Sequence, residues 1–383
     1  PKNPVLHGFA VLHDDARVTL YAEPAKFDDA IRAHMGTHVA LRPPAAFVPG
    51  LHTLTGPVRV DKASAPLAVS QELEAAGVAC VWGDDPCKLP KACKTAAEIE
   101  GARLAHLRDG AAMVNFLAWL DAEAPQGGLT EIAVVKALEG FRRATNALHD
   151  ISFDTICGAG SDGAIIHYRV TTDTDRPVRT GELLLVDSGG QYQDGTTDIT
   201  RTMAVGAVGD EERACYTRVL QGLIAISRAR FPKGVAGRDL DALARAALWM
   251  AGQDYDHGTG HGVGAFLSVH EGPQRISRLS EVPLQPGMIL SNEPGYYREG
   301  AFGIRLENLI VVTEAPPLGD NRPQLAFETL TFAPFDRRLI DLAMLSPGER
   351  AWIDAYHAEV LAKIGPRVEG GARDWLQAAC APL

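Results

Sequence analysis

Short apolar runs alternate with amphipathic stretches over the first ninety residues of the chain. Runs rich in β-branched and aromatic residues predict strands, and stretches with apolar residues three or four positions apart predict helices. The predicted strands cover residues 6–12, 17–21, 58–60 and 78–82, and the predicted helices cover residues 27–35 and 67–76. Strands that alternate with helices are typical of an α/β domain. Residues 83–94 are charged and rich in turn formers, so we expect the first domain to end there.

Two pairs of predicted helices follow, and each pair leads into a segment rich in predicted strands. The first of these helices begins at Thr95, with Glu98 at the spacing of a capping box. The four helices cover residues 95–120, 130–145, 210–230 and 237–252, and the strand-rich segments cover residues 150–205 and 257–312. A helix pair followed by strands, twice over, predicts a pseudo-duplicated α+β domain whose two halves curve around one site.

The composition restricts the functions that these domains can have. The chain has 383 residues, enough for two domains, and a net charge of −11. An acidic protein is not attracted to nucleic acid or to an anionic membrane surface, so neither is expected as a partner. No apolar run approaches the roughly eighteen residues needed to span a bilayer, and residues 1–4 have no signal-peptide character. The six cysteines lack the paired spacing of a zinc site, and reduced thiols fit the cytoplasmic location that we expect.

Two aspartates in the first strand-rich segment are candidate metal ligands. Asp187 ends a buried apolar run, where a charge without a partner would be costly. Asp198 follows an Asp194-Gly195 pair, which is typical of a hairpin turn. A plain turn at that pair would place Asp187 opposite Thr202, four positions from Asp198, so we expect an irregular hairpin with an earlier turn, near Tyr192-Gln193, or a bulge. The alternative interpretation is a turn cap and a surface aspartate.

A glycine-rich segment in the second strand-rich region contains three histidines, His257, His261 and His270. Its glycines would let the backbone approach a ligand closely, which is also a property of phosphate-binding loops. No Gly-Lys-Ser/Thr sequence follows, and phosphate binding is therefore disfavoured. The histidines could be core or surface residues, but separate carboxylates nearby favour roles as a ligand and as proton relays.

Two glutamates complete the set of candidate ligands. Glu293 and Glu307 each end or interrupt an apolar strand-like run, which is not the pattern of a solvated face. Arg305 would share a strand face with Glu307, where it could orient a carboxylate or bind a substrate backbone. The five candidate ligands are Asp187, Asp198, His261, Glu293 and Glu307. Four carboxylates and one imidazole are too many for one structural zinc, but they suit two hard divalent ions and indicate a hydrolase.

These blocks resemble the pita-bread metallopeptidase family, specifically the long cytosolic form of the Xaa-Pro aminopeptidases. The matching motifs are Ser152-Phe153, Gly163-Ala-Ile-Ile-His167-Tyr168, Asp187, Asp198 and residues 257–271, 293–297 and 303–308. The resemblance implies an α+β pita-bread catalytic domain over residues 95–335, a smaller α/β domain over residues 1–94 before it and a helical extension over residues 336–383. Long-form members begin with a further α/β domain, which we expect to be absent here, because Pro1 suggests a fragment or a processed product.

The resemblance also implies a role for each candidate ligand. Asp187 would chelate one metal ion, and Asp198 and Glu307 would bridge two. His261 and Glu293 would complete the shell, and Glu293 would also act as general base towards a water that bridges the metals. The cofactors implied are two divalent ions, most often manganese, with zinc or cobalt as alternatives.

Further residues resemble the substrate-binding groups of that family. His167 and His270 would face the substrate, to donate to the carbonyl oxygen and hold the peptide backbone, and His257, Tyr297 and Arg305 would line a proline pocket. Imidazole and phenol rings can stack on the pyrrolidine ring of a substrate whose proline nitrogen carries no hydrogen. We therefore expect an aminopeptidase that cleaves the bond before a proline in the second position of peptides. The resemblance further implies a homodimer.

Two alternative functions remain. A prolidase would share the fold and the metals but would cleave only dipeptides; the helical tail and residues 257–261 favour the aminopeptidase. Some pita-bread proteins have lost their ligands and serve as binding modules without catalysis. All five ligand positions are filled in this chain, which disfavours that interpretation.

Overall fold

The computed structural model describes residues 2–319 and 321–383. The chain divides into two compact units, a smaller one of residues Pro4–Pro90 and a larger one made mainly of Lys91–Leu383. The segment expected to end the first domain therefore contains the boundary between the units. It also contains a short helix, α4 (Lys88–Ala92), which the sequence pattern did not predict because five residues are too few to show a helical period.

The smaller unit is an α/β domain, as expected. Its elements are β1 (Gly8–Leu12), β2 (Val18–Ala22), α1 (Asp29–Met35), β3 (Val39–Arg42), α2 (Phe47–Leu51), β4 (Val58–Val60), α3 (Leu67–Ala75) and β5 (Cys80–Trp82). Strands β1, β2 and β3 form one sheet, and β4 pairs with β5 in parallel. All the predicted strands and helices are present, but β3 and α2 were not predicted. Leu51, Val60 and Leu73 are buried at the centre of this unit.

The larger unit begins with two pairs of long helices. These are α5 (Ala96–Glu123), α6 (Glu131–Arg143), α7 (Asp210–Ser227) and α8 (Gly237–Trp249). The predicted capping box of α5 is confirmed, because Thr95 and Glu98 bond to each other's backbone N–H groups. Helices α7 and α8 end three residues before their predicted ends, and residues after α7 form strand β12 (Arg230–Pro232). Among the described residues, no helix combines the length and the apolar character needed to cross a membrane.

Strands follow each helix pair. The first group is β6 (Asp150–Ile151), β7 (Ile156–Ala159), β8 (Glu182–Ser188), β9 (Gly190–Tyr192), β10 (Gly195–Thr196) and β11 (Ile199–Val205). The second group is β13 (Gly260–His261), β14 (Arg275–Ile276), β15 (Ile289–Asn292), β16 (Gly295–Arg298), β17 (Phe302–Arg305), β18 (Asn308–Ala315) and β19 (Gln324–Thr329). The first half contains a three-stranded sheet in the order β11-β8-β7. The second half contains a four-stranded sheet in the order β12-β19-β18-β15.

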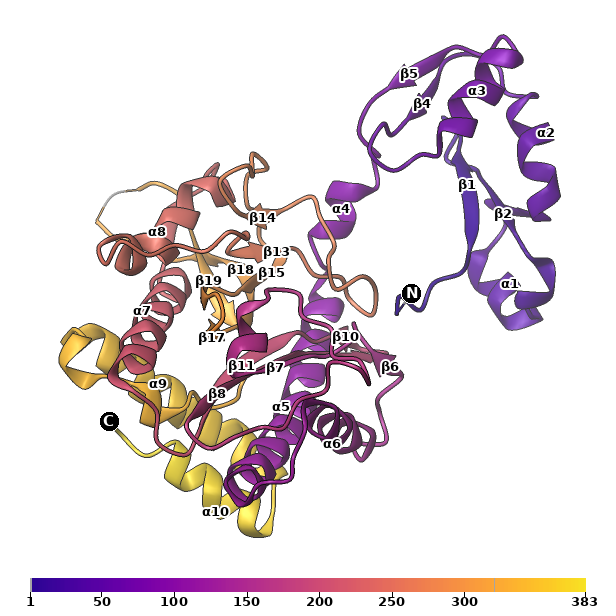
Figure 1. Cartoon of the computed structure of the whole chain (residues 1–383). Helices are drawn as coiled ribbons and strands as arrows, with labels where there is room; N and C mark the ends of the chain where they lie inside the picture. Colours follow the sequence, from indigo (N-terminus) through magenta and orange to yellow (C-terminus); the bar gives the residue numbers. More distant parts are fainter. Residues whose placement is uncertain (1, 320) are drawn as a thin grey trace. The chain divides into compact units, whose positions relative to one another are not determined.

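In each half the helices lie against a sheet (Figure 1), and buried apolar residues form a separate core there. Phe116 of α5 and Leu138 of α6 pack with Val186 of β8 in the first half. In the second half, Ala244 of α8 packs with Ile310 of β18. The repeated arrangement agrees with the predicted pseudo-duplicated α+β fold.

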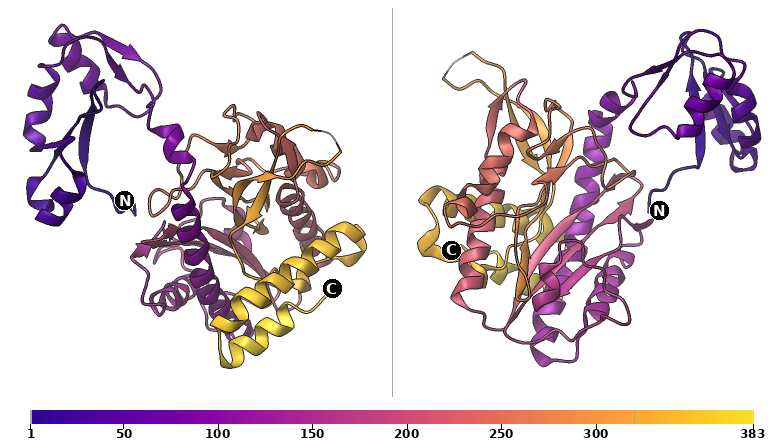
Figure 2. Two further views of the ribbon diagram at one scale, coloured as in Figure 1. Left: turned by 180° about the vertical axis from the view of Figure 1, so that it is seen from behind. Right: turned by 45° about the horizontal axis from the view of Figure 1, so that its top comes forward.

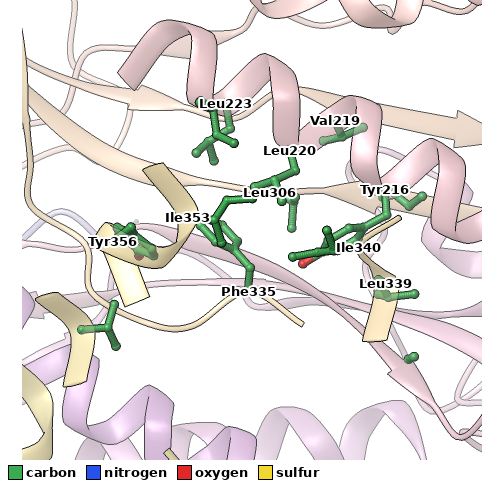
Figure 3. Packing of buried hydrophobic residues seen from close by; sticks show 14 of the residues in the cluster. Tyr216, Val219, Leu220, Leu223, Leu306, Phe335, Leu339, Ile340, Ile353 and Tyr356 are labelled. Atoms are coloured by element: carbon green, nitrogen blue, oxygen red, sulfur yellow. The ribbon is translucent and has the colours of Figure 1, made fainter. Parts of the chain in front are cut away.

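Two C-terminal helices, α9 (Pro347–Ile364) and α10 (Gly370–Ala379), close the larger unit and lie beside α5 (Figure 2). Helix α9 also supplies Ile353 to a core cluster that includes Leu220 of α7 and Leu306 (Figure 3). Leu306 is fully buried there. Because Leu306 immediately precedes Glu307, this packing helps to set where the Glu307 carboxylate lies.

The hairpin that carries Asp187 and Asp198 has a turn earlier than Asp194-Gly195, which was one of the two predicted alternatives, although it lies one residue after Tyr192-Gln193. Gly195 pairs with Tyr192, so the two-residue turn is Gln193-Asp194. Asp187 pairs with Thr200 in the same register. No residue is inserted on either side, so the expected bulge is absent and the hydrogen-bonded ladder is only interrupted between Ser188 and Gly190. Asp198 is two residues from Thr200, and it therefore shares a face with Asp187 without any bulge.

Candidate active site

The five candidate ligands come from strands, or from residues next to strands, in both halves of the larger unit. Asp187 lies in β8, and Asp198 immediately precedes β11. His261 ends β13, Glu293 follows β15, and Glu307 lies between β17 and β18. The duplicated fold brings these separate sequence blocks to one place.

Three of the five form a compact group of possible metal ligands. Asp198, His261 and Glu307 each offer an atom within 4.8 Å of the others. Nε2 of His261 also lies 3.4 Å from Oε1 of Glu293 and 3.5 Å from Oδ2 of Asp198. Ligand atoms that bind one ion at about 2.1 Å are about 3 to 3.5 Å apart, so this spacing suits a shared cation.

The His261 ring is oriented as a ligand. Its Nδ1 lies 3.0 Å from the carbonyl oxygen of Gly262, where an N–H on Nδ1 can donate. The lone pair is then on Nε2, the nitrogen that faces Glu293 and Asp198. Metal-binding histidines are commonly held in this way.

The carboxylates of the site lack sufficient neutralising partners within the described protein. Oδ1 of Asp187, Oδ1 of Asp198 and Oε1 of Glu307 are buried and accept no hydrogen bond. Burial, and then repulsion from neighbouring carboxylates, raise the pKa of Asp198 and Glu307 well above the usual range. Burial also raises the pKa of Glu293. Buried acids with free oxygens on one face are the donor set that hard divalent cations take, so these residues fit the predicted metals.

Two hydroxyl groups orient these carboxylates, and the sequence interpretation missed both. Oγ1 of Thr200 donates to Oε2 of Glu307 at 2.8 Å. Oγ of Ser291 donates to Oε1 of Glu293 at 3.0 Å and accepts from the backbone N–H of His261 at 2.9 Å. Thr200 is two residues after Asp198, and Ser291 is two residues before Glu293. The alternation of side chains along a strand could have indicated both residues.

The glycines of the histidine-rich segment serve the packing of the protein itself. A Cβ atom on Gly260 would collide with the backbone carbonyl of Ser291, and one on Gly262 would collide with that of Glu271. Glycine therefore lets β13 lie close to β15. The sequence pattern predicted that these glycines let the backbone approach a ligand. At Gly260 and Gly262 they instead let the backbone approach another part of the protein backbone.

A chain of hydrogen bonds leads from Asp187 to His257. Nη2 of Arg305 lies 2.6 Å from Oδ2 of Asp187, and Nη1 donates to the hydroxyl of Tyr297 at 2.7 Å. That hydroxyl lies 2.9 Å from Nε2 of His257, whose Nδ1 lies 2.8 Å from the carbonyl oxygen of Gly258. Burial and the charge of Arg305 lower the pKa of His257 to about 3. His257 is thus neutral, with Nδ1 as donor and Nε2 as acceptor from Tyr297.

The two remaining predicted residues lie near this chain and the ligands. The His270 ring meets the His261 ring edge-on, with centroids 4.3 Å apart. Burial and His261 lower the pKa of His270 to about 4, so its ring is neutral at neutral pH. His167 is exposed, and it lies close enough to His257 and His270 to contribute to the lowering of the pKa of both. All ten predicted site residues therefore belong to one region.

A buried network behind His257 was not predicted. Asp241 and Arg245, both in α8, form an ion pair with a shortest distance of 2.7 Å. Asp241 accepts from the hydroxyl of Thr259 at 2.6 Å, and Arg245 donates to the carbonyl oxygen of His257 at 2.7 Å. The carbonyl oxygen of Thr259 in turn accepts from the backbone N–H of Glu293 at 2.8 Å. This network fixes the histidine-rich segment against α8. The spacing of four residues between Asp241 and Arg245 indicates their ion pair, but no local pattern indicates their contacts with Thr259 and His257.

Three family models match the sequence. Residues 100–314 match metallopeptidase family M24, and residues 323–383 match the C-terminal region of peptidase M24. Residues 1–98 match the creatinase/prolidase N-terminal domain. The first of these matches covers more than half of the chain.

Individual relatives agree with the family models. A protein named probable Xaa-Pro aminopeptidase P from Laccaria bicolor is 42% identical over 100% of this chain and 61% of its own length. Aminopeptidase P2 from Arabidopsis thaliana is 39% identical over 100% of this chain and 59% of its own length. The chain thus spans about six-tenths of the length of these curated relatives.

Solved structures show the same fold. The X-prolyl aminopeptidase from Caenorhabditis elegans, described as a cytosolic enzyme with a di-nuclear active site, aligns with a TM-score of 0.92 at 32% identity. That alignment covers 100% of this chain and 64% of the other. An Xaa-Pro dipeptidase from Bacillus anthracis aligns with a TM-score of 0.72 at 24% identity, over 87% of this chain and 89% of its own, and supports the pita-bread fold alone.

Proposed function

The chain belongs to metallopeptidase family M24, and we propose that it is an Xaa-Pro aminopeptidase, which removes the N-terminal residue from peptides with proline in second position. The observation that carries this proposal is the buried group of carboxylates around Nε2 of His261, next to the Arg305–Tyr297–His257 chain. The names of the relatives from Laccaria bicolor and Arabidopsis thaliana support the same activity.

Two divalent metal ions fit this group of residues. Asp187, Asp198, His261, Glu293 and Glu307 would hold them, and four of these five side chains offer oxygen. Bound there, the ions would lower the pKa of a water nucleophile and stabilise the negative charge on the substrate carbonyl oxygen. We propose manganese as the native metal because an oxygen-rich shell suits it, with zinc and cobalt as alternatives.

Proton transfer is assigned to Glu293. Its carboxylate lies 3.4 Å from Nε2 of His261, among the proposed metal ligands, so it would be within reach of a water held by the metals. We propose that it accepts a proton from the attacking water and delivers it to the nitrogen of the leaving proline. The hydroxyl of Ser291 keeps Oε1 of Glu293 oriented during both steps.

The substrate carbonyl and backbone are assigned to His167 and His270. His270 is neutral at neutral pH, so one ring nitrogen can donate a hydrogen bond while the other accepts one. His167 is exposed to solvent and can reach a bound peptide. Neither residue is needed as a metal ligand.

Proline selection is assigned to His257, Tyr297 and Arg305. The proline ring of a substrate is apolar and lacks an N–H, so a pocket for it must offer ring surfaces rather than an acceptor. Rings of His257 and Tyr297 lie with centroids 5.4 Å apart, in an edge-on arrangement. Arg305 holds the Tyr297 hydroxyl and so keeps this wall in place.

Cleavage of tripeptides against dipeptides tests the proposal. The protein loaded with Mn²⁺ should cleave Arg-Pro-Pro with a higher kcat/KM than Arg-Pro. Activity confined to dipeptides would make the chain a prolidase. Absence of cleavage of both peptides, with metals bound, would favour a binding module of the same fold.

Assembly and location are also proposals. We infer a homodimer, and we infer a cytoplasmic location because the Caenorhabditis elegans protein is described as a cytosolic enzyme. Light scattering on the purified protein tests the first of these. Peptides with proline in second position are the proposed substrates, and neither nucleic acid nor membrane is proposed as a partner.

A further inference from the structure

His167 is the exposed residue of a segment that is anchored on both sides. The carbonyl oxygen of the residue before it, Ile166, accepts from Nη1 of Arg305 at 3.3 Å. The residue after it, Tyr168, is only 7% exposed. Its ring packs with Ile156 and Leu185, and Tyr297 packs against the same cluster. The position of the His167 ring therefore depends on how firmly Tyr168 is held.

A buried carboxylate holds Tyr168 by its hydroxyl. Glu131, the first residue of α6, is fully buried, and its Oε2 lies 3.0 Å from the hydroxyl of Tyr168. Its other oxygen, Oε1, accepts from the backbone N–H of Ala159 at 2.7 Å. Ala159 ends β7 and immediately precedes the 3-10 turn η4 (Gly160–Ala164), which leads to His167. One side chain thus binds this segment at both of its ends.

The surroundings of Glu131 disfavour the ionised form of its carboxyl group. Burial, with a smaller contribution from Asp162, raises the pKa of Glu131 to about 7, although the bonds from Ala159 and Tyr168 oppose that rise. The nearby Arg176 neutralises Glu182, at 2.6 Å, and donates to the carbonyl oxygen of Ala159. The Asp175 carboxylate faces the same helix start, where it accepts from the N–H of Ile132. An unneutralised buried acid of this kind destabilises the fold near neutral pH, which an apolar residue would not do.

We propose that Glu131 and Tyr168 are positioning residues for His167, and that they hold its ring at the distance from the substrate that donation to the peptide requires. This inference rests on the proposed function, in which His167 contacts substrate. Among the described residues, neither Glu131 nor Tyr168 forms a hydrogen bond with a candidate metal ligand. Tyr297 packs against the same cluster as Tyr168, but an effect through Tyr297 would persist in a His167→Ala background, whereas an effect through His167 would not.

A double-mutant cycle with His167 tests this inference. Tyr168→Phe removes the hydroxyl, and Glu131→Gln replaces the carboxyl group with an amide of the same shape, which carries no charge at any pH. Each should lower kcat/KM for Arg-Pro-Pro about tenfold, since small misplacements of a catalytic group have large effects on rate. In a His167→Ala background, where the ring is absent, each should change kcat/KM less than twofold.

The matched control is Tyr216→Phe. Tyr216 is a buried tyrosine of α7 whose hydroxyl accepts from the N–H of Asp336 at 3.0 Å, away from His167. The Tyr216→Phe variant should have a lower melting temperature, as Tyr168→Phe should, but an unchanged kcat/KM. Equal losses of kcat/KM in the wild-type and His167→Ala backgrounds, or no loss in either, would overturn the proposal. If the Tyr168→Phe variant does not fold, the same comparison of kcat/KM in the two backgrounds is made with Glu131→Gln alone.

A measurement independent of activity separates this inference from the proposed function. The NMR signal of the His167 ring can be assigned by its loss in His167→Ala. It should shift or broaden in Tyr168→Phe and in Glu131→Gln and remain unchanged in Tyr216→Phe. An unchanged His167 signal in both variants would reject the positioning role, whether or not the wild-type chain cleaves peptides. If the signal shifts in the variants but the wild-type chain cleaves no peptide, only the proposed function is rejected.

Discussion

Nη2 of Arg305 lies 2.6 Å from Oδ2 of Asp187, and both side chains are buried. The same guanidinium donates through Nη1 to the hydroxyl of Tyr297. One planar group thus joins a candidate metal ligand to the candidate wall of the proline pocket. Metal binding and substrate selection therefore share a structural element.

Arg305→Lys should lower activity without removing the metals. Lysine keeps the positive charge but has one donor group, so it cannot contact Asp187 and Tyr297 in the same planar geometry. We expect kcat/KM for Arg-Pro-Pro to fall about tenfold or more, mainly through KM, with two metal ions still bound by elemental analysis. The control is Arg238→Lys, at an exposed arginine paired with Glu281, which should keep full activity. Normal KM in Arg305→Lys would contradict the shared role.

Glu293→Gln should nearly abolish turnover and weaken metal binding. Glutamine cannot accept the proton of the attacking water, and it is a poorer ligand than a carboxylate. We expect kcat to fall by roughly a thousandfold or more, with a lower metal content after dialysis. Glu314→Gln, which changes an exposed glutamate paired with Lys233, serves as control. A Glu293→Gln variant with most of the wild-type turnover would exclude the proposed base.

His270→Ala should lower turnover while both metals stay bound. The ring packs edge-on against the candidate ligand His261 but has no place among the five ligands. Because the pKa of His270 is lowered to about 4, it stays neutral from pH 6 to pH 8, and its titration should not appear in the pH–rate profile over that range. Elemental analysis and kinetics check this together. Loss of one metal in His270→Ala would identify it as a ligand.

Metal removal should make stability depend strongly on pH. In the metal-free fold the pKa values of Asp198, Glu293 and Glu307 are raised, so the folded protein retains protons that the unfolded chain has released. The free energy of unfolding should therefore fall as pH rises from the usual range of carboxyl groups through these raised pKa values.

Bound divalent ions would keep the three carboxylates ionised at little cost, and the fall should then diminish. Urea unfolding at pH 5 and pH 8, with EDTA or with Mn²⁺, measures both effects. Asp198→Asn should weaken the pH dependence in EDTA. A pH dependence that is the same with and without Mn²⁺ would argue against metal binding by this group.

Glu131 should add a second, metal-independent pH dependence. Its pKa in the fold is about 7, above the usual value of 4.5, so the wild type loses stability as pH rises between these two values. Glu131→Gln has no such titration. The free energy of unfolding of the wild type minus that of the variant should fall by up to about 3 kcal/mol between pH 4.5 and pH 8. A constant difference would mean that Glu131 has an ordinary pKa.

Local patterns predicted much of this molecule. The cap at Thr95, the alternation of strands and helices, and the candidate ligands at strand ends all depend on residues within a few positions of one another. The pattern failed where elements were too short for a period, as in α4 and β3. It also left open whether the hairpin of Asp187 and Asp198 has an earlier turn or a bulge, and the register shows the earlier turn, at Gln193-Asp194.

The sequence by itself determined which chemical groups are available: four carboxylates, the histidines, one arginine and one tyrosine, each in a recognisable block. Only the tertiary structure decided which groups meet. Arg305 contacts Asp187 across 118 positions, Thr200 contacts Glu307 across 107, and Tyr168 contacts Glu131 across 37. Such partners are chosen by strand register and by helix packing, because these place side chains that are distant in the chain within hydrogen-bonding distance. No local periodicity encodes that choice.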